Sequence, residues 1–160
     1  MFGVFKKRKG VLCATQSGSI LVLENVPDPM FAGKMLGDGF AVLPAAAEVY
    51  APVSGEVVSV YDGSFHCYGL RDENGVEVLV HIGIDTVHLK NGEITPKVTQ
   101  NQKVKAGDLI AVVNLEKIKS AGINLHTMTI ISNLEKVKSL QLQKKNAVTH
   151  GEAVLEYTLV

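Results

Sequence analysis

The chain has 160 residues, and its 16 Lys+Arg and 16 Asp+Glu give a formal net charge of zero. This length is enough for one domain with a hydrophobic core, and a neutral chain has no general attraction to nucleic acid. The two cysteines, Cys13 and Cys67, have no metal-ligand spacing, and no apolar run is long enough to cross a membrane. We therefore expect a cytoplasmic protein.

The N-terminus combines a short apolar patch with a basic cluster at residues 6–9. So short a segment does not hold a helix in water, so residues 1–13 are predicted to be a flexible basic tail and residues 14–160 a single domain. Two interpretations of the tail stay open. It is either a solvated terminus or a weak, reversible contact of residues 1–9 with an anionic membrane, where each basic residue contributes about 1 kcal/mol.

From residue 14 onward, short strand-like runs alternate with Gly, Pro and Asp, and helical periodicity is scarce. This pattern predicts an all-β body. Residues 14–23 and 51–60 both begin Ala-x-x-Ser-Gly and continue into an apolar run. The recurrence suggests an internal duplication, although common turn chemistry also produces such matches.

Residues 26–36 form a rigid loop, because two prolines flank Asp28, and a single helical turn is expected at its end. The loop has more large apolar side chains than a surface loop needs, namely Met30, Phe31, Met35 and Leu36. We expect about half of them to pack beneath the loop and the others to form an exposed patch for a partner.

The centre of the chain is the strand-like stretch at residues 76–87. Alternate side chains of a strand point to opposite faces. One face carries Val76, Val78, Val80 and Ile82, and the other carries Glu77, Leu79, His81 and Gly83. The first set suits a core. A histidine beside an outward leucine and a glycine indicates a docking site on the second.

A second strand-like run, residues 64–70, precedes this stretch, and the turn between them ends in Asn74-Gly75. Asn-Gly between two apolar runs predicts a β-hairpin. The hairpin would place His66 and His81 almost opposite each other. Whether the two imidazoles share a face depends on the register, which the sequence leaves open.

Two short helices are expected further on. Asn114 is a cap residue for a helix that runs to residue 121 and stops at Gly122. The Ser-Asn-Leu-Glu at residues 132–135 is a capping box that predicts a helix to about Leu140. Residues 153–160 are predicted to form the last strand.

The sequence has no P-loop, dinucleotide fingerprint, His-Glu-x-x-His motif or Gly-x-Ser-x-Gly elbow. His66 and His81 remain as candidates, because a neutral imidazole is a competent nucleophile near pH 7 and can attack phosphorus. Ser64 and the backbone N–H groups near Gly83 would then donate to phosphoryl oxygens. Asp85 is negative and suits a positively charged partner.

Residues 80–87 (Val-His-Ile-Gly-Ile-Asp-Thr-Val), together with His66 and with Ala-Pro-Val-Ser-Gly at 51–55, resemble the glucose-family enzyme IIA domain of the bacterial sugar phosphotransferase system. The resemblance covers nearly all of residues 15–160. It extends through Phe31, residues 37–39, 105–108 and 131–133.

The resemblance implies an antiparallel β-sandwich, a barrel-sandwich hybrid, that acts as a phosphotransferase component without cofactor or metal. The histidine matching His81 accepts a phosphoryl group on Nε2 from the phosphocarrier HPr. It then passes the group to a cysteine of an enzyme IIB domain. The histidine matching His66 supports the transfer, and the position of Ser64 is a hydroxyl residue, commonly threonine.

The resemblance also implies a docking rim for HPr. Asp28 and Asp85 match acidic positions that face basic groups of HPr, and Phe31 matches the apolar rim. Met30, Leu79 and Val87 complete the expected partner-binding set. Met30, Met35 and Leu79 replace other apolar residues of the family rim, a difference that bears on partner preference. A monomer that visits the inner face of the cell membrane is expected, and the sugar it serves lies outside the sequence.

Three alternatives differ in class. A zinc hydrolase would use His66 and His81 with a third ligand that the sequence does not offer. A biotinyl or lipoyl carrier is suggested by Ala-Pro-x-x-Gly, but it needs a lysine at a hairpin tip, where this chain has Asn-Gly. A regulatory protein controlled by its phosphorylation state is compatible with the carrier role.

Overall fold

The computed structural model describes residues 8–160, most of which lie in antiparallel sheets. The largest sheet has the strand order β13 (Ala147–Val148), β2 (Gly18–Val22), β3 (Asp38–Pro44), β11 (Thr127–Ile131), β7 (Glu77–Ile82), β6 (Cys67–Arg71), β5 (Gly55–Val60) and β9 (Lys103–Val104). A second sheet has the order β1 (Lys9–Cys13), β14 (Ala153–Leu159) and β12 (Val137–Leu142). A third has the order β4 (Glu48–Tyr50), β10 (Leu109–Val113) and β8 (Ile94–Pro96).

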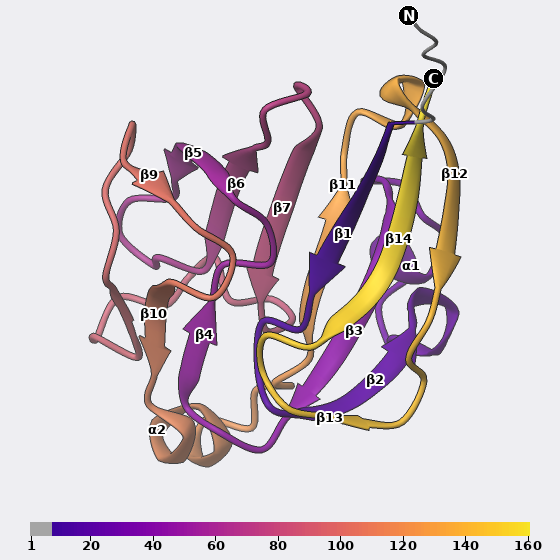
Figure 1. Ribbon diagram of the computed structural model, residues 1–160. Coiled ribbons are helices and arrows are strands. Elements are labelled where there is room, and N and C mark those ends of the chain that lie inside the picture. The colour runs from indigo at the N-terminus through magenta and orange to yellow at the C-terminus, as the bar shows by residue number, and fades with distance from the viewer. Residues whose placement is uncertain (1–7) are drawn as a thin grey trace, which may run out of the picture.

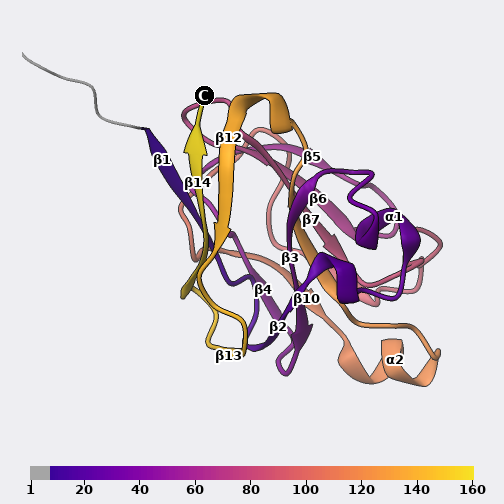
Figure 2. The ribbon, with the colours of Figure 1, turned by 90° about the vertical axis from the view of Figure 1, so that its right-hand side faces the viewer.

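The sheets pack as layers around one main core. Figure 2 shows β1, β14 and β12 as a layer on one side of the strands of the large sheet. Side chains from both layers, among them Phe40, Tyr68, Val80 and Tyr157, are almost completely buried in this core. The predicted all-β antiparallel sandwich is therefore confirmed.

A short helical segment covers the opposite face of the large sheet. It consists of a 3-10 turn, Leu23–Asn25, and helix α1, Pro29–Ala32, which Figure 2 shows on the far side from β1 and β14. Asp28 caps α1 by accepting the N–H of Met30 at 2.9 Å, and Pro29 takes the first helical position. A second buried cluster, which includes Phe31 and Met128, lies beneath this segment.

Of the two later helices, one is confirmed and the other is wrong. Helix α2, Leu115–Ser120, begins where Asn114 accepts the N–H of Lys117 at 3.1 Å, and it lies at the lower end of the molecule in Figure 1. The predicted capping box at residues 132–135 opens only a 3-10 turn, Leu134–Lys136, and the chain then enters β12.

The two Ala-x-x-Ser-Gly segments make equivalent contacts. Ala14 donates its N–H to the carbonyl of Glu152, and Ala51 donates its N–H to the carbonyl of Asp108, each at 2.8 Å. The hydroxyl of the serine three residues later accepts a backbone N–H from the turn before that acidic residue, at 3.1 Å and 2.8 Å respectively. This repeated arrangement supports the internal duplication.

The predicted boundary of the N-terminal tail at residue 13 needs correction. Lys9–Cys13 is strand β1, which pairs with β14 from Lys9 opposite Thr158 onward. Leu12 is fully buried, so this segment contributes to the core despite its basic start. Residues 1–7, on which most of the tail prediction rests, lie outside the described residues. Within residues 8–160, no helix has the length and apolarity needed to cross a membrane.

Candidate active site

Strand β7 shows the predicted division into two faces. Val78 and Val80 are completely buried in the main core, and Ile82 is 1% exposed. Leu79 and His81 lie on the other face and are half-buried. The predicted orientation of His81 away from the main core is thus confirmed, but its face is covered in part by the loop that carries α1.

Two contacts fix the imidazole of His81. Its Nδ1 lies 2.9 Å from the carbonyl oxygen of Gly83, and an imidazole nitrogen facing a carbonyl must be the protonated, donating one. The ring of Phe31 lies against it at a centroid distance of 5.0 Å. The proton is therefore held on Nδ1, and Nε2 carries a free lone pair.

The pairing of β6 with β7 does not by itself explain why His66 lies next to His81. The residue directly opposite His81 in the β6–β7 pair is Cys67, not His66. Phe65, with φ of 55°, turns the chain just before β6, and the carbonyl of His66 accepts the N–H of Ile82 at 2.7 Å. The two imidazoles then lie almost perpendicular, with centroids 4.8 Å apart and an interplanar angle of 84°.

The side chain of His66 is held from two sides. The hydroxyl of Ser64 lies 2.5 Å from its Nδ1, and Ser64 and His66 are each 4% exposed. The ring of Tyr61 packs edge-on at a centroid distance of 4.7 Å. The sequence analysis missed Tyr61, because it follows β5 in a loop and no spacing or motif connects it with the histidines.

Burial sets the charge state of both histidines. It lowers the pKa of His66 to about 4, and the neighbouring His81 contributes to this decrease. Burial also lowers the pKa of His81, while the bond to Gly83 and the charges of Asp28 and Asp85 act in the opposite direction. Both imidazoles are consequently neutral at pH 7.

A depression of about 190 Å³ lies beside His81. Its lining includes five residues that the sequence analysis assigned to the rim, namely Asp28, Met30, Phe31, Asp85 and Val87. Leu36 and Thr86 also line it and were not assigned to the rim; Thr86 lies inside the central stretch, and its hydroxyl donates to the carbonyl of Ile82 at 2.6 Å. Leu79 is half-buried on the same face and does not line the depression.

Of the four large apolar side chains of the loop, Phe31 packs beneath it and Met30, Met35 and Leu36 are exposed, so the expectation that about half are buried was too high. Phe31 is 5% exposed and packs in the second core cluster, whereas Met30 is 47% and Met35 is 71% exposed. Leu36 and Val87 add further exposed apolar surface. His81 thus lies beside a surface that carries exposed apolar side chains.

The backbone N–H groups of Gly83 and Ile84 are not available as phosphoryl donors. The N–H of Gly83 donates to the carbonyl of His126 at 2.8 Å, and that of Ile84 donates to the carbonyl of Asn124 at 3.0 Å. The expectation that these groups stabilise a phosphoryl group is therefore wrong. Among residues 8–160, no group of three His, Cys, Asp or Glu side chains is arranged to hold a metal ion.

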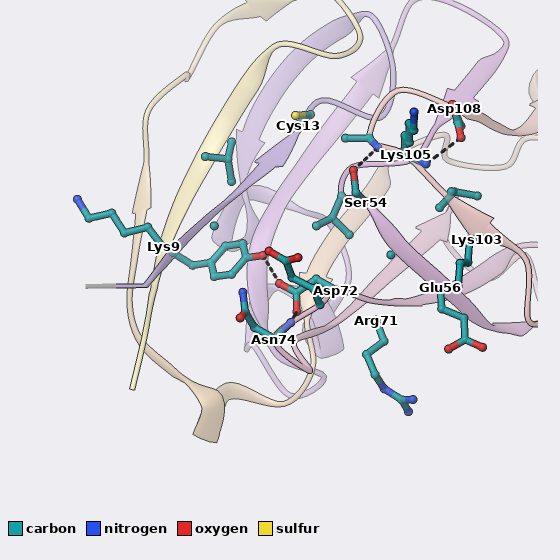
Figure 3. Close-up of a pocket in the computed structure, with 18 residues that line it drawn as sticks. Lys9, Cys13, Ser54, Glu56, Arg71, Asp72, Asn74, Lys103, Lys105 and Asp108 are labelled. Carbon is teal, nitrogen blue, oxygen red and sulfur yellow. Dashed lines mark hydrogen bonds between the residues drawn. The ribbon is translucent and has the colours of Figure 1, made fainter. Parts of the chain in front are cut away.

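A larger cavity of about 1150 Å³ lies elsewhere, along β1 and the tip of the β6–β7 hairpin, and neither histidine lines it. The carboxylate of Asp72, which is labelled in Figure 3, accepts the hydroxyl of Tyr157 at 2.7 Å. Asp72 also accepts the N–H groups of Asn74 and Val76, each at 2.8 Å. These bonds connect the hairpin tip to β14, so the polar groups at this end of the cavity have a structural role.

The chain, a β-sandwich with two neighbouring histidines of which His81 lines a depression, matches one family along most of its length. The family model described as the phosphoenolpyruvate-dependent sugar phosphotransferase system, EIIA 1, matches residues 10–137. The chain therefore belongs to the IIA family of this system and is a phosphocarrier component of it.

Individual relatives agree. The chain is 36% identical over 151 residues to the PTS system glucose-specific EIIA component of Buchnera aphidicola, covering 94% of this chain and 92% of the relative. It is 41% identical over 155 residues to the glucose-specific EIICBA component of Streptococcus pneumoniae, covering 97% of this chain but only 21% of that protein. The solved glucose permease IIA of Mycoplasma capricolum superposes with a TM-score of 0.87 at 34% identity, covering 97% of this chain and 99% of that one.

Proposed function

We propose that His81 accepts a phosphoryl group on Nε2 from the phosphohistidine of HPr and passes it to a cysteine of an enzyme IIB domain. The observation that supports this most directly is the bond from Nδ1 of His81 to the carbonyl of Gly83. It leaves Nε2 as the nucleophilic nitrogen, in a ring whose pKa is lowered by burial.

The transfer balances without any further reactant. The lone pair of Nε2 attacks phosphorus, an N–P bond forms on His81, and the N–P bond on the HPr histidine breaks, returning the electron pair to that imidazole. In the second step a thiolate of enzyme IIB attacks the same phosphorus, and His81 recovers its lone pair. Nδ1 of His81 keeps its proton and its hydrogen bond to the carbonyl of Gly83 throughout. This bond counters the positive charge that phosphorylation places on the ring.

His66 supports the phosphoryl group in transit. When Ser64 donates its hydroxyl hydrogen to Nδ1 of His66, the proton of that imidazole lies on Nε2, where it is free to donate to a phosphoryl oxygen. Burial keeps the pKa of His66 at about 4, so the donor is neutral at pH 7. A neutral donor stabilises the phosphoryl group during transfer but holds it less tightly than a fixed positive charge would.

The rim residues assigned to partner binding fit a basic partner. Asp28 and Asp85 line the depression beside His81, and Met30 and Val87 give it exposed apolar surface. Charge complementarity of this kind raises the association rate, whereas apolar contacts lengthen the lifetime of the complex. Leu79, half-buried on the same face, belongs to this proposed surface as a supporting residue.

The experiment is phosphorylation with labelled phosphoenolpyruvate, enzyme I and HPr. We expect an acid-labile, base-stable label on wild-type protein and none on His81→Ala, while His88→Ala, in which the replaced ring is exposed, is labelled as wild type. His66→Gln keeps a donor and should accept phosphate but deliver it to enzyme IIB more slowly. Full labelling of His81→Ala, or a stable label on residue 66, would contradict the assignment.

We further propose that the protein acts as a monomer in the cytoplasm and that its N-terminus contacts anionic membrane weakly. Four adjacent basic residues lie at positions 6–9, but Lys9 already belongs to β1 and pairs with Glu156 at 3.5 Å. Deleting residues 1–7 therefore tests the tail without removing β1. Delivery of phosphate to enzyme IIB in low-salt membrane vesicles should slow, and acceptance from HPr should not; equal delivery rates would show that the tail has no such role.

A further inference from the structure

The peptide group that holds His81 is itself held from the other side. The carbonyl of Gly83 accepts Nδ1–H of His81, and the N–H of the same peptide group, which belongs to Ile84, donates to the carbonyl of Asn124 at 3.0 Å. A methyl group on Gly83 would lie 3.2 Å from that carbonyl oxygen, so the two segments pack closely. The orientation of the Gly83 carbonyl thus depends on a residue some forty positions away.

The preceding peptide group is fixed in the same way. The N–H of Gly83 donates to the carbonyl of His126 at 2.8 Å, and the carbonyl of Ile82 accepts the hydroxyl of Thr86 at 2.6 Å. Gly83 has a φ of +75°, a conformation that costs energy for other residues and that these bonds maintain. Both peptide groups around Gly83 are therefore bound at both ends.

The side chain of Asn124 shapes the segment that supplies the two carbonyls. Its Oδ1 accepts the backbone N–H of His126 at 3.3 Å, an Asx turn, and it also contacts Nδ1 of the His126 ring. The turn sets the relative directions of the carbonyls of Asn124 and His126. Neither side chain lines the depression beside His81, so their effect on it is indirect.

We propose that Asn124 is a positioning residue for phosphoryl transfer. Its Asx turn aims two carbonyls at the peptide groups on either side of Gly83, and the Gly83 carbonyl in turn fixes Nδ1 of His81 and presents Nε2 to the phosphoryl group. The catalytic consequence rests on the proposed function of His81. Bonds that share one peptide group polarise each other, so loosening the bond to Asn124 weakens the bond to His81 as well.

The first test reads the imidazole of His81 directly, in the full unphosphorylated chain, by nitrogen-15 NMR. In Asn124→Ala, we expect the Nδ1–H tautomer of His81 to lose population and its pKa to fall, because the bond to Gly83 is one of the influences that raise it. Asn124→Ser, whose hydroxyl can still form a turn, should remain close to wild type. Asn114→Ala is the matched control, since it removes an equivalent asparagine cap from α2.

The second test measures phosphoryl acceptance from phospho-HPr by rapid quench. Asn124→Ala should be slower by about two- to tenfold, the range that corresponds to one net hydrogen bond, and Asn124→Ser and Asn114→Ala should match wild type. A wild-type tautomer and rate in Asn124→Ala would overturn the proposal, as would the same loss in Asn114→Ala. If the tautomer changes in Asn124→Ala but wild-type His81 takes no phosphate, the positioning role holds and the proposed function fails.

Discussion

The buried position of His66 makes the stability of the protein depend on pH in a defined window. In the unfolded chain this imidazole takes up a proton near its ordinary pKa of 6.5, whereas burial and the neighbouring His81 lower its pKa in the folded protein to about 4. Between these values the unfolded chain binds more protons than the folded one. The stability is therefore fully present above about pH 6.5 and is lost as the pH falls toward 4.

The magnitude follows from the same two values. At about 1.4 kcal/mol per pH unit, the full loss is roughly 3 kcal/mol, and most of it has occurred by pH 4.5. A loss of this size is a large fraction of the stability of an ordinary domain. In His66→Gln there is no imidazole to titrate, so this component of the pH dependence should disappear, whatever fixed effect the substitution has at pH 7.

The assay is urea denaturation at pH 7 and pH 4.5, followed by circular dichroism. Wild-type protein should lose about 2 to 3 kcal/mol more between the two pH values than His66→Gln does. His88→Gln, in which the replaced ring is exposed, should lose as much as wild type. An equal loss in wild type and His66→Gln would show that other groups cause the acid sensitivity and would refute the reasoning.

Three further predictions concern the site. Because the pKa of His81 is lowered below 6.5, phosphoryl acceptance measured by rapid quench should stay level from pH 8 to about 6.5, and a decline that begins above this range would contradict a neutral nucleophile. In stopped-flow measurements, Asp85→Lys should slow association with HPr more at low salt than at high salt, whereas the control Glu116→Lys on α2 should not. An effect independent of ionic strength would indicate a structural role for Asp85. Gly83→Ala should lower the free energy of unfolding by about 1–3 kcal/mol in urea denaturation, and the variant should also lose phosphoryl acceptance. The reason is that the added Cβ would lie 2.6 Å from Thr86, at a φ of +75° that disfavours side chains. Unchanged stability would show that this loop relaxes freely.

The parts of the fold that the sequence predicted are those set by local chemistry. The alternation along β7 depends only on the strand period, and α2 begins at an asparagine whose side chain caps it. The capping box at residues 132–135 failed because its first two residues bind the β6–β7 hairpin. The hydroxyl of Ser132 donates to the carbonyl of Glu77 at 3.4 Å, and the side chain of Asn133 accepts the N–H of Glu77 and donates to the carbonyl of Gly75, each at 2.8 Å.

In the candidate site, too, local features were predictable from the sequence and contacts between distant segments were not. The central stretch identified His81, and its neighbour Gly83 attracted attention for a correct reason, a close approach of another backbone. The meeting of His66 with His81 was left to the strand register, but the register places Cys67 opposite His81. What brings the rings together is the positive φ of Phe65, a conformation that no sequence pattern announces for a phenylalanine.

The charges around His81 explain why such a site suits a carrier. The depression beside His81 is lined by two carboxylates, by apolar side chains and by Thr86, and among the described residues no lysine or arginine lines it. A fixed cation would stabilise the bound phosphoryl group and make its onward transfer unfavourable, whereas the carboxylates of Asp28 and Asp85 repel it. The proposed support comes instead from His66, which is neutral because its pKa is about 4. In the proposed mechanism, hydrogen bonding without a neutralising charge keeps the phosphoramidate on His81 reactive enough to be passed on.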